Sequence, residues 1–231
     1  MRDTDPALTR LPPVRPGQRI GLFGGSFDPP HDGHRAVSLE ALMKPPAPAD
    51  RWAWECIYPR PYEDIVRAQE EARKVPAGLV HAVMRQESFF RTTVTSPVGA
   101  RGLMQLMPNT AARVGGEIGI AVDPAEIVRP DLNVTLGTFY LGKLLDNFGG
   151  HVALASASYN AGPMAVARWL EGGEQEADLF VARIPFHETR TYVQRVLANF
   201  ARYQYLAGGV EAVSPFELTL PATVDIGDDA Y

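Results

Sequence analysis

Cysteine is almost missing from this chain. Cys56 is the only one in 231 residues, so an intrachain disulfide framework and a cysteine-rich metal site are both excluded. Long apolar runs are missing as well, because no segment reaches the roughly 18 apolar residues that a membrane-spanning helix needs. Residues 1–17 lack the apolar stretch and cleavage site of a signal peptide. We therefore expect no transmembrane segment and recognise no export signal.

Positive charge is also scarce. The chain has 22 basic and 27 acidic residues, a formal net charge of -5, and it has no basic stripe that would neutralise phosphates. We therefore expect no nucleic-acid partner, whereas a neutral sugar polymer is compatible with this charge. Hydrophobic residues make up 45% of the chain, the usual share for a globular protein with a core.

Proline and charge divide the chain into segments. Residues 1–17 are rich in both and are expected to form a disordered lead-in. Residues 18–44 have the pattern of a short strand, a Gly/Pro turn and a helix, and residues 45–57 form a Pro-rich linker. Residues 58–206 are expected to form one helical domain. Residues 207–231 are acidic and are expected to form a flexible tail.

The apolar residues of the segment 58–206 recur at helical spacing, which makes the expected fold class mainly α. The predicted helices cover 62–74, a stretch that opens at Pro76 and carries Glu87, 103–114 with an interruption at Pro108, 133–148, 152–159, a short helix ending at Trp169, and 188–206. Residues 172–178 are expected to form a polar loop.

Glu87 differs from the other charged residues because its helix places it on an apolar face. Val80, Val83 and Met84 precede it by seven, four and three positions, so on a helix they share its face. Most glutamates lie on solvated faces, but this placement predicts that Glu87 points inward. Desolvation raises the pKa of a carboxyl group, which suits a residue that must donate a proton near neutral pH.

Four separated motifs follow one another in the helical segment. They are Glu87-Ser88, 102–108 (Gly-Leu-Met-Gln-Leu-Met-Pro), 158–163 (Ser-Tyr-Asn-Ala-Gly-Pro) and 184–193 (Ile-Pro-Phe-His-Glu-Thr-Arg-Thr-Tyr-Val). In this order they resemble the soluble lytic transglycosylase family, from about Tyr58 to about Tyr205. The one departure is Ser158, where the family usually has alanine. The resemblance implies a lysozyme-like fold and cleavage of peptidoglycan between N-acetylmuramic acid and N-acetylglucosamine.

The same resemblance implies a mechanism with one carboxyl group. Glu87 would protonate the glycosidic oxygen and then, as a carboxylate, take a proton from the sugar's C6 hydroxyl, leaving a 1,6-anhydromuramic end. The enzyme would be a carbon–oxygen lyase with no metal and no cofactor. Most glycosidases instead use a second catalytic carboxylate to attack the sugar or to activate water.

The resemblance also assigns substrate-binding residues: Ser96, Gln105, Met107, Tyr159, Asn160 and Glu188. Simpler interpretations stay open for three of them, namely core packing for Met107, a buried hydroxyl for Tyr159 and stabilisation of a helix N-terminus for Glu188. The expected partner is a peptidoglycan glycan strand, bound by a monomer in the periplasm or cell envelope. A hydrolytic lysozyme and an inactive peptidoglycan-binding module are the alternatives.

A second resemblance lies in residues 19–34, where a short apolar strand and a Gly/Pro turn precede His31 and His34. This stretch is similar to the opening motif of nicotinate-mononucleotide adenylyltransferases, which holds nucleotide phosphates. That family needs a complete doubly wound sheet, and only one strand and one helix precede the linker. We therefore expect both histidines to be inactive, as parts of a fusion remnant or gene-model artefact. A remnant that still binds ATP is the remote alternative.

Overall fold

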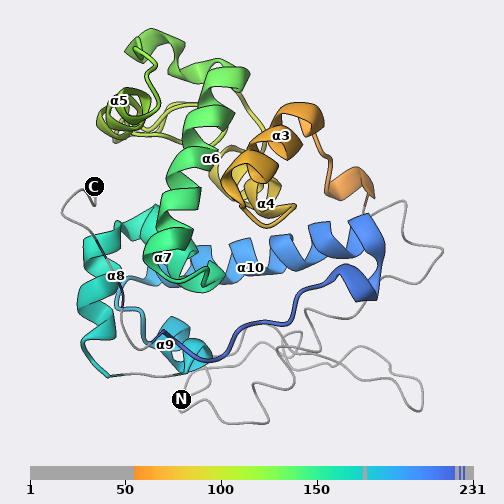
Figure 1. Cartoon of the computed structure of the whole chain (residues 1–231), viewed down its shortest axis with the longest axis vertical. Helices are drawn as coiled ribbons and strands as arrows, with labels where there is room; N and C mark the ends of the chain where they lie inside the picture. The colour runs from red at the N-terminus through yellow and green to blue at the C-terminus, as the bar shows by residue number, and fades with distance from the viewer. Residues whose placement is uncertain (1–54, 174–175, 222–223, 225, 227–231) are drawn as a thin grey trace, which may run out of the picture. The chain divides into compact units, whose positions relative to one another are not determined.

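The protein is described by a computed structural model that covers residues 55–173, 176–221, 224 and 226. These residues belong to one compact unit, 45–231. The elements in chain order are α3 (Glu63–Arg73), α4 (Leu79–Ser88), α5 (Pro108–Glu117), the 3-10 helix η3 (Pro124–Val128), α6 (Pro130–Asn147), α7 (Val152–Ala161), α8 (Pro163–Leu170), α9 (Ala177–Arg183), α10 (His187–Gly208) and the 3-10 helix η4 (Val210–Ala212) (Figure 1). Strand pairing within this part of the chain is limited to isolated bridges. The mainly α prediction is confirmed.

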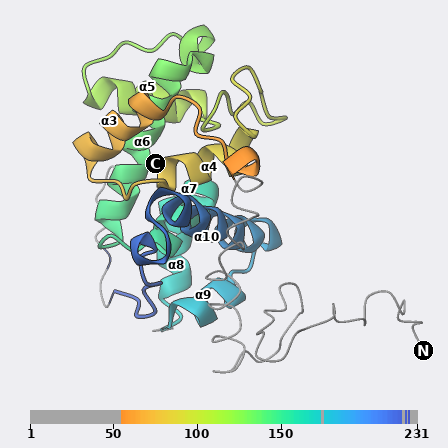
Figure 2. The ribbon, with the colours of Figure 1, turned by 90° about the vertical axis from the view of Figure 1, so that its right-hand side faces the viewer.

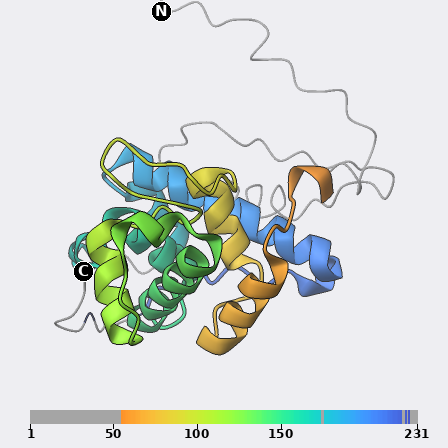
Figure 3. The same ribbon diagram turned by 90° about the horizontal axis from the view of Figure 1, so that it is seen from above.

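Two long helices organise the unit. The 22-residue α10 packs against α4 and α7, and the 18-residue α6 packs against α3 and α7. Figures 1 and 2 show α3 to α6 in the upper half of the described region and α8 to α10 in the lower half. From above, α4 crosses α10 (Figure 3). Because of this crossing, the final turn of α4 meets the first turns of α10.

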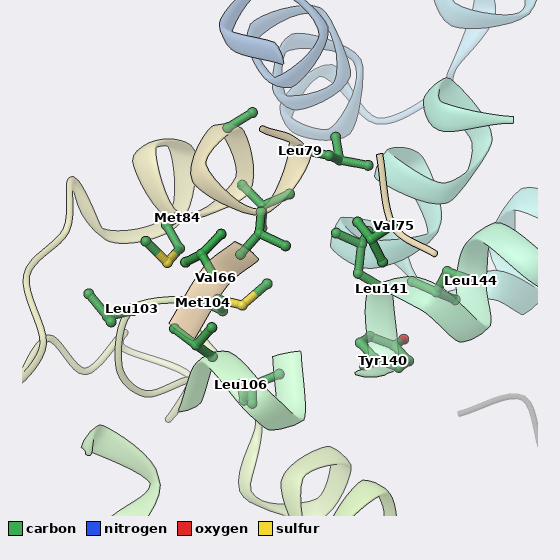
Figure 4. Packing of buried hydrophobic residues seen from close by; sticks show 14 of the residues in the cluster. Val66, Val75, Leu79, Met84, Leu103, Met104, Leu106, Tyr140, Leu141 and Leu144 are labelled. Atoms are coloured by element: carbon green, nitrogen blue, oxygen red, sulfur yellow. The ribbon is translucent and has the colours of Figure 1, made fainter. Parts of the chain in front are cut away.

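The buried side chains form two clusters. The first lies among α3, α4, α6 and α10, and its fully buried members include Met84 and Met104 (Figure 4). Met104 approaches α6 closely because Gly137 has no Cβ; one built there would lie 2.4 Å from its sulfur. The second cluster joins α7, α8 and α9 to the start of α10. Met104 is therefore a residue of the first buried cluster.

Three local predictions differ from the structure. The helix that carries Glu87 begins at Leu79 rather than Pro76, since Gly78 with φ 92° turns the chain just before it. Residues 103–107 form a loop, and helix α5 begins at Pro108, a position where proline's missing N–H costs nothing. Helix α9 was not predicted. It has only seven residues, and it depends on burying Ala177, Phe180 and Val181.

The tail after α10 also differs from the loosely ordered segment that we expected. The N–H of Ala177 donates to the carbonyl of Leu218 at 2.8 Å, and Glu176 bridges to Thr219. Leu220 is buried in the second cluster, against which Phe216 also packs. These apolar residues hold the chain between 213 and 221 because the second cluster would otherwise be open to water.

The two remaining predictions concern the N-terminal segments and membrane-spanning helices. The expected lead-in, the strand–turn–helix fragment with His31 and His34, and most of the linker lie outside the described residues. Among the helices of the described region, none combines the length and the apolar character needed to cross a bilayer.

Candidate active site

Glu87 lies in the last turn of α4, on the face predicted from its spacing to Val80, Val83 and Met84. Those three side chains are fully buried, and Glu87 itself is partly buried. The helix ends immediately afterwards, because Phe89 adopts a left-handed conformation with φ 49°. Phe90 follows with φ 63°. Two successive bulky residues with positive φ are uncommon, and such strain often accompanies functional sites.

The hydroxyl of Tyr192 donates a hydrogen bond to Oε1 of Glu87 at 2.7 Å. Burial raises the pKa of Glu87 to about 7, the bond from Tyr192 opposes the rise, and the negative charge of Glu188 adds to it. Near neutral pH, the carboxyl group is therefore present in comparable amounts as acid and as carboxylate. This side chain can both give and accept a proton under physiological conditions.

Tyr159 lies beside this acid. Its hydroxyl donates to the carbonyl of Met104 at 2.9 Å, and its ring packs against Tyr140 with centroids 5.4 Å apart. Burial and the nearby charge of Glu87 raise the pKa of Tyr159 and of Tyr192 well above the usual 10. Both tyrosines therefore stay neutral and keep their hydroxyl protons as hydrogen-bond donors.

Asn160 connects the end of α7 with the start of α10, where Glu188 also lies. Oδ1 of Asn160 accepts a 2.7 Å hydrogen bond from the hydroxyl of Thr189. Glu188 is exposed in the first turn of α10, where its charge also favours the positive end of the helix. Its effect on the pKa of Glu87 shows that its charge also acts on the acid. Glu188 can thus stabilise the N-terminus of α10 and also act electrostatically on Glu87.

Ser96 belongs to a tight loop that follows α4. Its Oγ accepts the N–H of Ala100 at 3.0 Å, and its own N–H donates to the carbonyl of Ala100 at 2.9 Å. Gly99, with φ 94°, allows this turn. This bond leaves the hydroxyl proton of Ser96 available as a hydrogen-bond donor.

Gln105 braces the next turn of the same loop. It has φ 48°, and its Nε2 donates to the carbonyls of Val94 at 3.1 Å and Gly102 at 2.8 Å. A saccharide contact would therefore fall to Oε1. Met107, two residues on, is 41% exposed at the start of α5. Core packing is excluded as its sole role.

Two residues hold this loop against the helices: Ser88, which belongs to the first sequence motif, and Asn133, which was not predicted as a site residue. The buried Asn133 of α6 accepts the N–H of Met104 at 2.7 Å and donates to the carbonyls of Arg101 at 3.0 Å and Ile127 at 2.8 Å. The hydroxyl of Ser88 lies 2.8 Å from the carbonyl of Leu103. The loop and the final turn of α4 are therefore fixed relative to each other.

Of the predicted site residues, Tyr159 and Glu188 interact electrostatically with Glu87, and Asn160 bonds to Thr189, the residue after Glu188. Ser96, Gln105 and Met107 belong to the 96–107 loop, which follows α4 in the chain. Tyr192 was missed as a site residue, although it lies within the fourth motif. Its position four residues after Glu188, on the same helical face, was the available signal in the sequence. Within the described ranges, no three His, Cys, Asp or Glu side chains are grouped so that they could hold a metal ion.

Comparison with known proteins agrees with this arrangement. The sequence profile "Transglycosylase SLT domain" matches residues 64–179, half of the chain, and the profile "Soluble lytic transglycosylase helical domain" matches residues 183–212. The soluble lytic murein transglycosylase of Escherichia coli K12 is 40% identical over 155 residues, which are 65% of this chain and 24% of that protein. The chain thus spans about a quarter of the length of this curated relative.

A solved structure and a shorter match complete the comparison. The lytic transglycosylase Slt of Pseudomonas aeruginosa, solved as an inactive mutant, aligns with a TM-score of 0.68 and 31% identity over 82% of this chain and 31% of that one. A protein of Ruegeria pomeroyi named "Probable nicotinate-nucleotide adenylyltransferase" is 74% identical over 32 residues, only 14% of this chain and 15% of that protein. Both resemblances seen in the sequence are confirmed, the second as a fragment. By its motifs, its fold and its matched length, this chain belongs to the transglycosylase SLT domain family.

Proposed function

We propose that this chain is a peptidoglycan lytic transglycosylase that cleaves the β-1,4 bond between N-acetylmuramic acid and N-acetylglucosamine without water. The observation that supports it most is the environment of Glu87, whose pKa is raised by burial to about 7 while Tyr192 donates to its carboxyl oxygen at 2.7 Å. The soluble lytic murein transglycosylases that it resembles carry this activity in their names.

In the proposed reaction, protonated Glu87 gives its proton to the glycosidic oxygen as the bond to the anomeric carbon breaks. The carboxylate that results accepts the proton of the C6 hydroxyl, and O6 bonds to the anomeric carbon to close the 1,6-anhydro ring. Proton transfers balance within the cycle, so Glu87 ends protonated. Tyr192 supports the carboxylate between the two steps because its hydroxyl stays a donor throughout.

Substrate binding is proposed for residues on both sides of this acid. Ser96 and Gln105 offer a hydroxyl proton and an amide oxygen from the loop, and Met107 offers an exposed apolar surface. Tyr159 and Asn160 of α7 and Glu188 of α10 would line the opposite side. The catalytic domain proposed here spans about residues 58–206, preceded by a lead-in (1–17), a nucleotidyltransferase-like fragment (18–44) and a linker (45–57), and followed by the tail (207–231). It would act in the periplasm or cell envelope.

Mass spectrometry of digested sacculi tests the reaction. The proposal expects muropeptides with anhydro ends, each lighter by one water than the reducing ends made by a hydrolase. Glu87→Gln keeps the size of the side chain and one carbonyl oxygen but cannot donate a carboxyl proton, so it should remove cleavage. The neighbouring Gln86→Glu variant, also on the last turn of α4, is the control for charge changes. Cleavage undiminished in Glu87→Gln would show that another group is the acid.

The presence of Glu188 keeps hydrolysis as a second candidate, because a second carboxylate beside the acid is what a hydrolytic glycosidase needs. Glu188→Gln separates the two. A transglycosylase should retain anhydro products at a reduced rate, whereas an enzyme that relies on Glu188 to activate water should lose activity about as fully as with Glu87→Gln. Reducing ends in the wild-type digest would replace our proposal with hydrolysis.

A further inference from the structure

An aromatic pair joins α8 to the start of α10 and has no part in the reaction proposed above. Phe186, the residue just before α10, meets the ring of Trp169 from α8 edge to face, with centroids 5.5 Å apart. Trp169 is anchored by packing against the second buried cluster. Phe186 belongs to neither cluster and is 57% exposed. The pair therefore presents one fixed and accessible ring at the surface.

Chain connectivity ties this ring to the candidate site. Phe186 precedes Glu188 by two residues, a distance of about 7 Å or less along the backbone, and the charge of Glu188 acts on Glu87. In Figure 1 the start of α10 lies on the side of α8 and α9, while its other end extends away from them. The ring therefore lies at the same end of α10 as Glu188.

The exposed ring has a chemistry that fits a sugar. A pyranose presents C–H groups on one face, and an aromatic face that is held in place can cover them without losing side-chain entropy on binding. The edge-to-face contact with Trp169 holds the ring of Phe186, and the cluster beneath holds Trp169. We propose that Phe186, positioned by Trp169, is an outlying subsite for an N-acetylhexosamine ring of the glycan strand, away from the bond that is cleaved. The inference rests on the proposed function for the identity of the strand.

Binding to a peptide-free sugar chain tests this subsite independently of catalysis. The full chain with Glu87→Gln is titrated calorimetrically with chitohexaose, a β-1,4-linked N-acetylglucosamine oligomer, and with purified glycan strands. Adding Phe186→Ala should weaken binding about five- to tenfold. Phe186→Tyr should bind within about twofold of the parent, whereas Phe186→Leu, which is apolar but has no ring, should bind like the alanine variant.

A control and an optical measurement make the test specific. Val210 is also exposed and apolar but lies beyond the other end of α10, roughly 30 Å away given the rise of a 22-residue helix. Val210→Ala should leave sugar binding unchanged. Binding should also change tryptophan emission, and this change should be lost in Trp169→Phe.

The outcomes separate this inference from the proposed function. Equal affinities of the alanine, leucine and parent proteins for chitohexaose would overturn the subsite, as would an effect of Phe186→Ala on intact peptidoglycan alone, which would point to the stem peptide. Failure of the parent to bind either sugar chain would overturn it as well. Wild-type protein that makes no anhydro ends, yet binds chitohexaose through Phe186, would refute the proposed reaction and retain the subsite.

Discussion

The hydroxyl of Tyr192 and the carboxyl group of Glu87 lie 2.7 Å apart, although 105 residues separate them in the chain. This bond joins the last turn of α4 to α10 at the point where the two helices cross. It also opposes the effect of burial on the pKa of Glu87, and so keeps that pKa near neutrality rather than higher. A single donor thus supports both the position and the proton equilibrium of the acid.

Replacing Tyr192 by phenylalanine should separate these two effects. Without the donor, the pKa of Glu87 should rise, and the alkaline limb of the pH–rate profile should move to higher pH. We expect kcat to fall about tenfold, because the carboxylate formed after the first step loses a charge-assisted hydrogen bond. Tyr159→Phe is the matched control, since its hydroxyl donates to Met104 and not to the acid. If the alkaline limb of the pH–rate profile lies at the same pH in both variants, Tyr192 does not affect the pKa of Glu87.

Activity should depend on one proton. The acid form of Glu87 is required for the first step, and its pKa is about 7, so kcat/KM should decline above neutrality as that form disappears. Going from pH 7 to pH 8 should reduce it about fivefold, and further increases should reduce it about tenfold per unit. Rates on a soluble glycan across pH 5 to 9 check this. A flat profile up to pH 9 would contradict a single acid at Glu87.

Glu70 should make the stability of the fold depend on pH. It is buried on α3, its Oε1 accepts the N–H groups of Gly78 and Val80 at 3.0 Å, and burial raises its pKa to about 7. A folded pKa above the unfolded value means that its protonated form favours folding. This contribution is complete below about pH 4.5 and is lost as the pH rises through about 7, by up to about 3 kcal/mol.

Glu70→Gln removes this ionisation and keeps the Oε1 acceptor. Denaturant unfolding at pH 5 and pH 8 should show the variant gaining stability relative to wild type as the pH rises. Glu71→Gln, an exposed neighbour on α3, should follow the wild type at both pH values. If Glu70→Gln and wild type differ in unfolding free energy by the same amount at both pH values, Glu70 does not titrate in this range.

Asn133 should be among the most sensitive positions of α6. Asn133→Leu has a similar volume but removes the bonds to the N–H of Met104 and the carbonyl of Arg101 in the loop and to the carbonyl of Ile127 in η3. We expect a loss of roughly 2–4 kcal/mol in unfolding free energy, together with reduced activity as the loop loosens. Thr138→Val on the same helix is the control, since its buried hydroxyl has no hydrogen-bond partner among the described residues. It should change stability by about 0.5 kcal/mol or less.

Gly102 and Gly99 allow backbone strain to be separated from steric overlap. Both have positive φ, at 79° and 94°, but a Cβ at Gly102 would lie 2.4 Å from Nδ2 of Asn133, whereas one at Gly99 would meet nothing within 4 Å. Gly99→Ala should cost about 1 kcal/mol from strain alone. Gly102→Ala should cost roughly 2 kcal/mol more, because Asn133 must move. Thermal unfolding of both variants measures the difference, and equal losses would show that the loop yields without disturbing Asn133.

The local periodicity of the sequence predicts most of the long helices and the face of α4 that carries Glu87. The face of α4 that carries Glu87 follows from the spacing of Val80, Val83 and Met84, because a helix repeats every 3.6 residues whatever it packs against. The same rule predicted α6 and α10 with their ends correct to within about three residues. Helix α9 and the packed tail were not predictable in this way, since each depends on burying residues in a cluster built by other parts of the chain.

Tertiary packing alone decided the chemistry around the acid. The sequence motifs indicated which segments matter, but not that Tyr192 would donate to Glu87, that Asn133 would hold the loop, or that Trp169 would meet Phe186. Each of these contacts joins residues that are distant in the chain. Whether the two side chains meet depends on how the helices cross, and the pattern within one helix does not predict it. The pKa of Glu87 likewise depends on what surrounds it in space, because desolvation and charge act through distance and not through sequence.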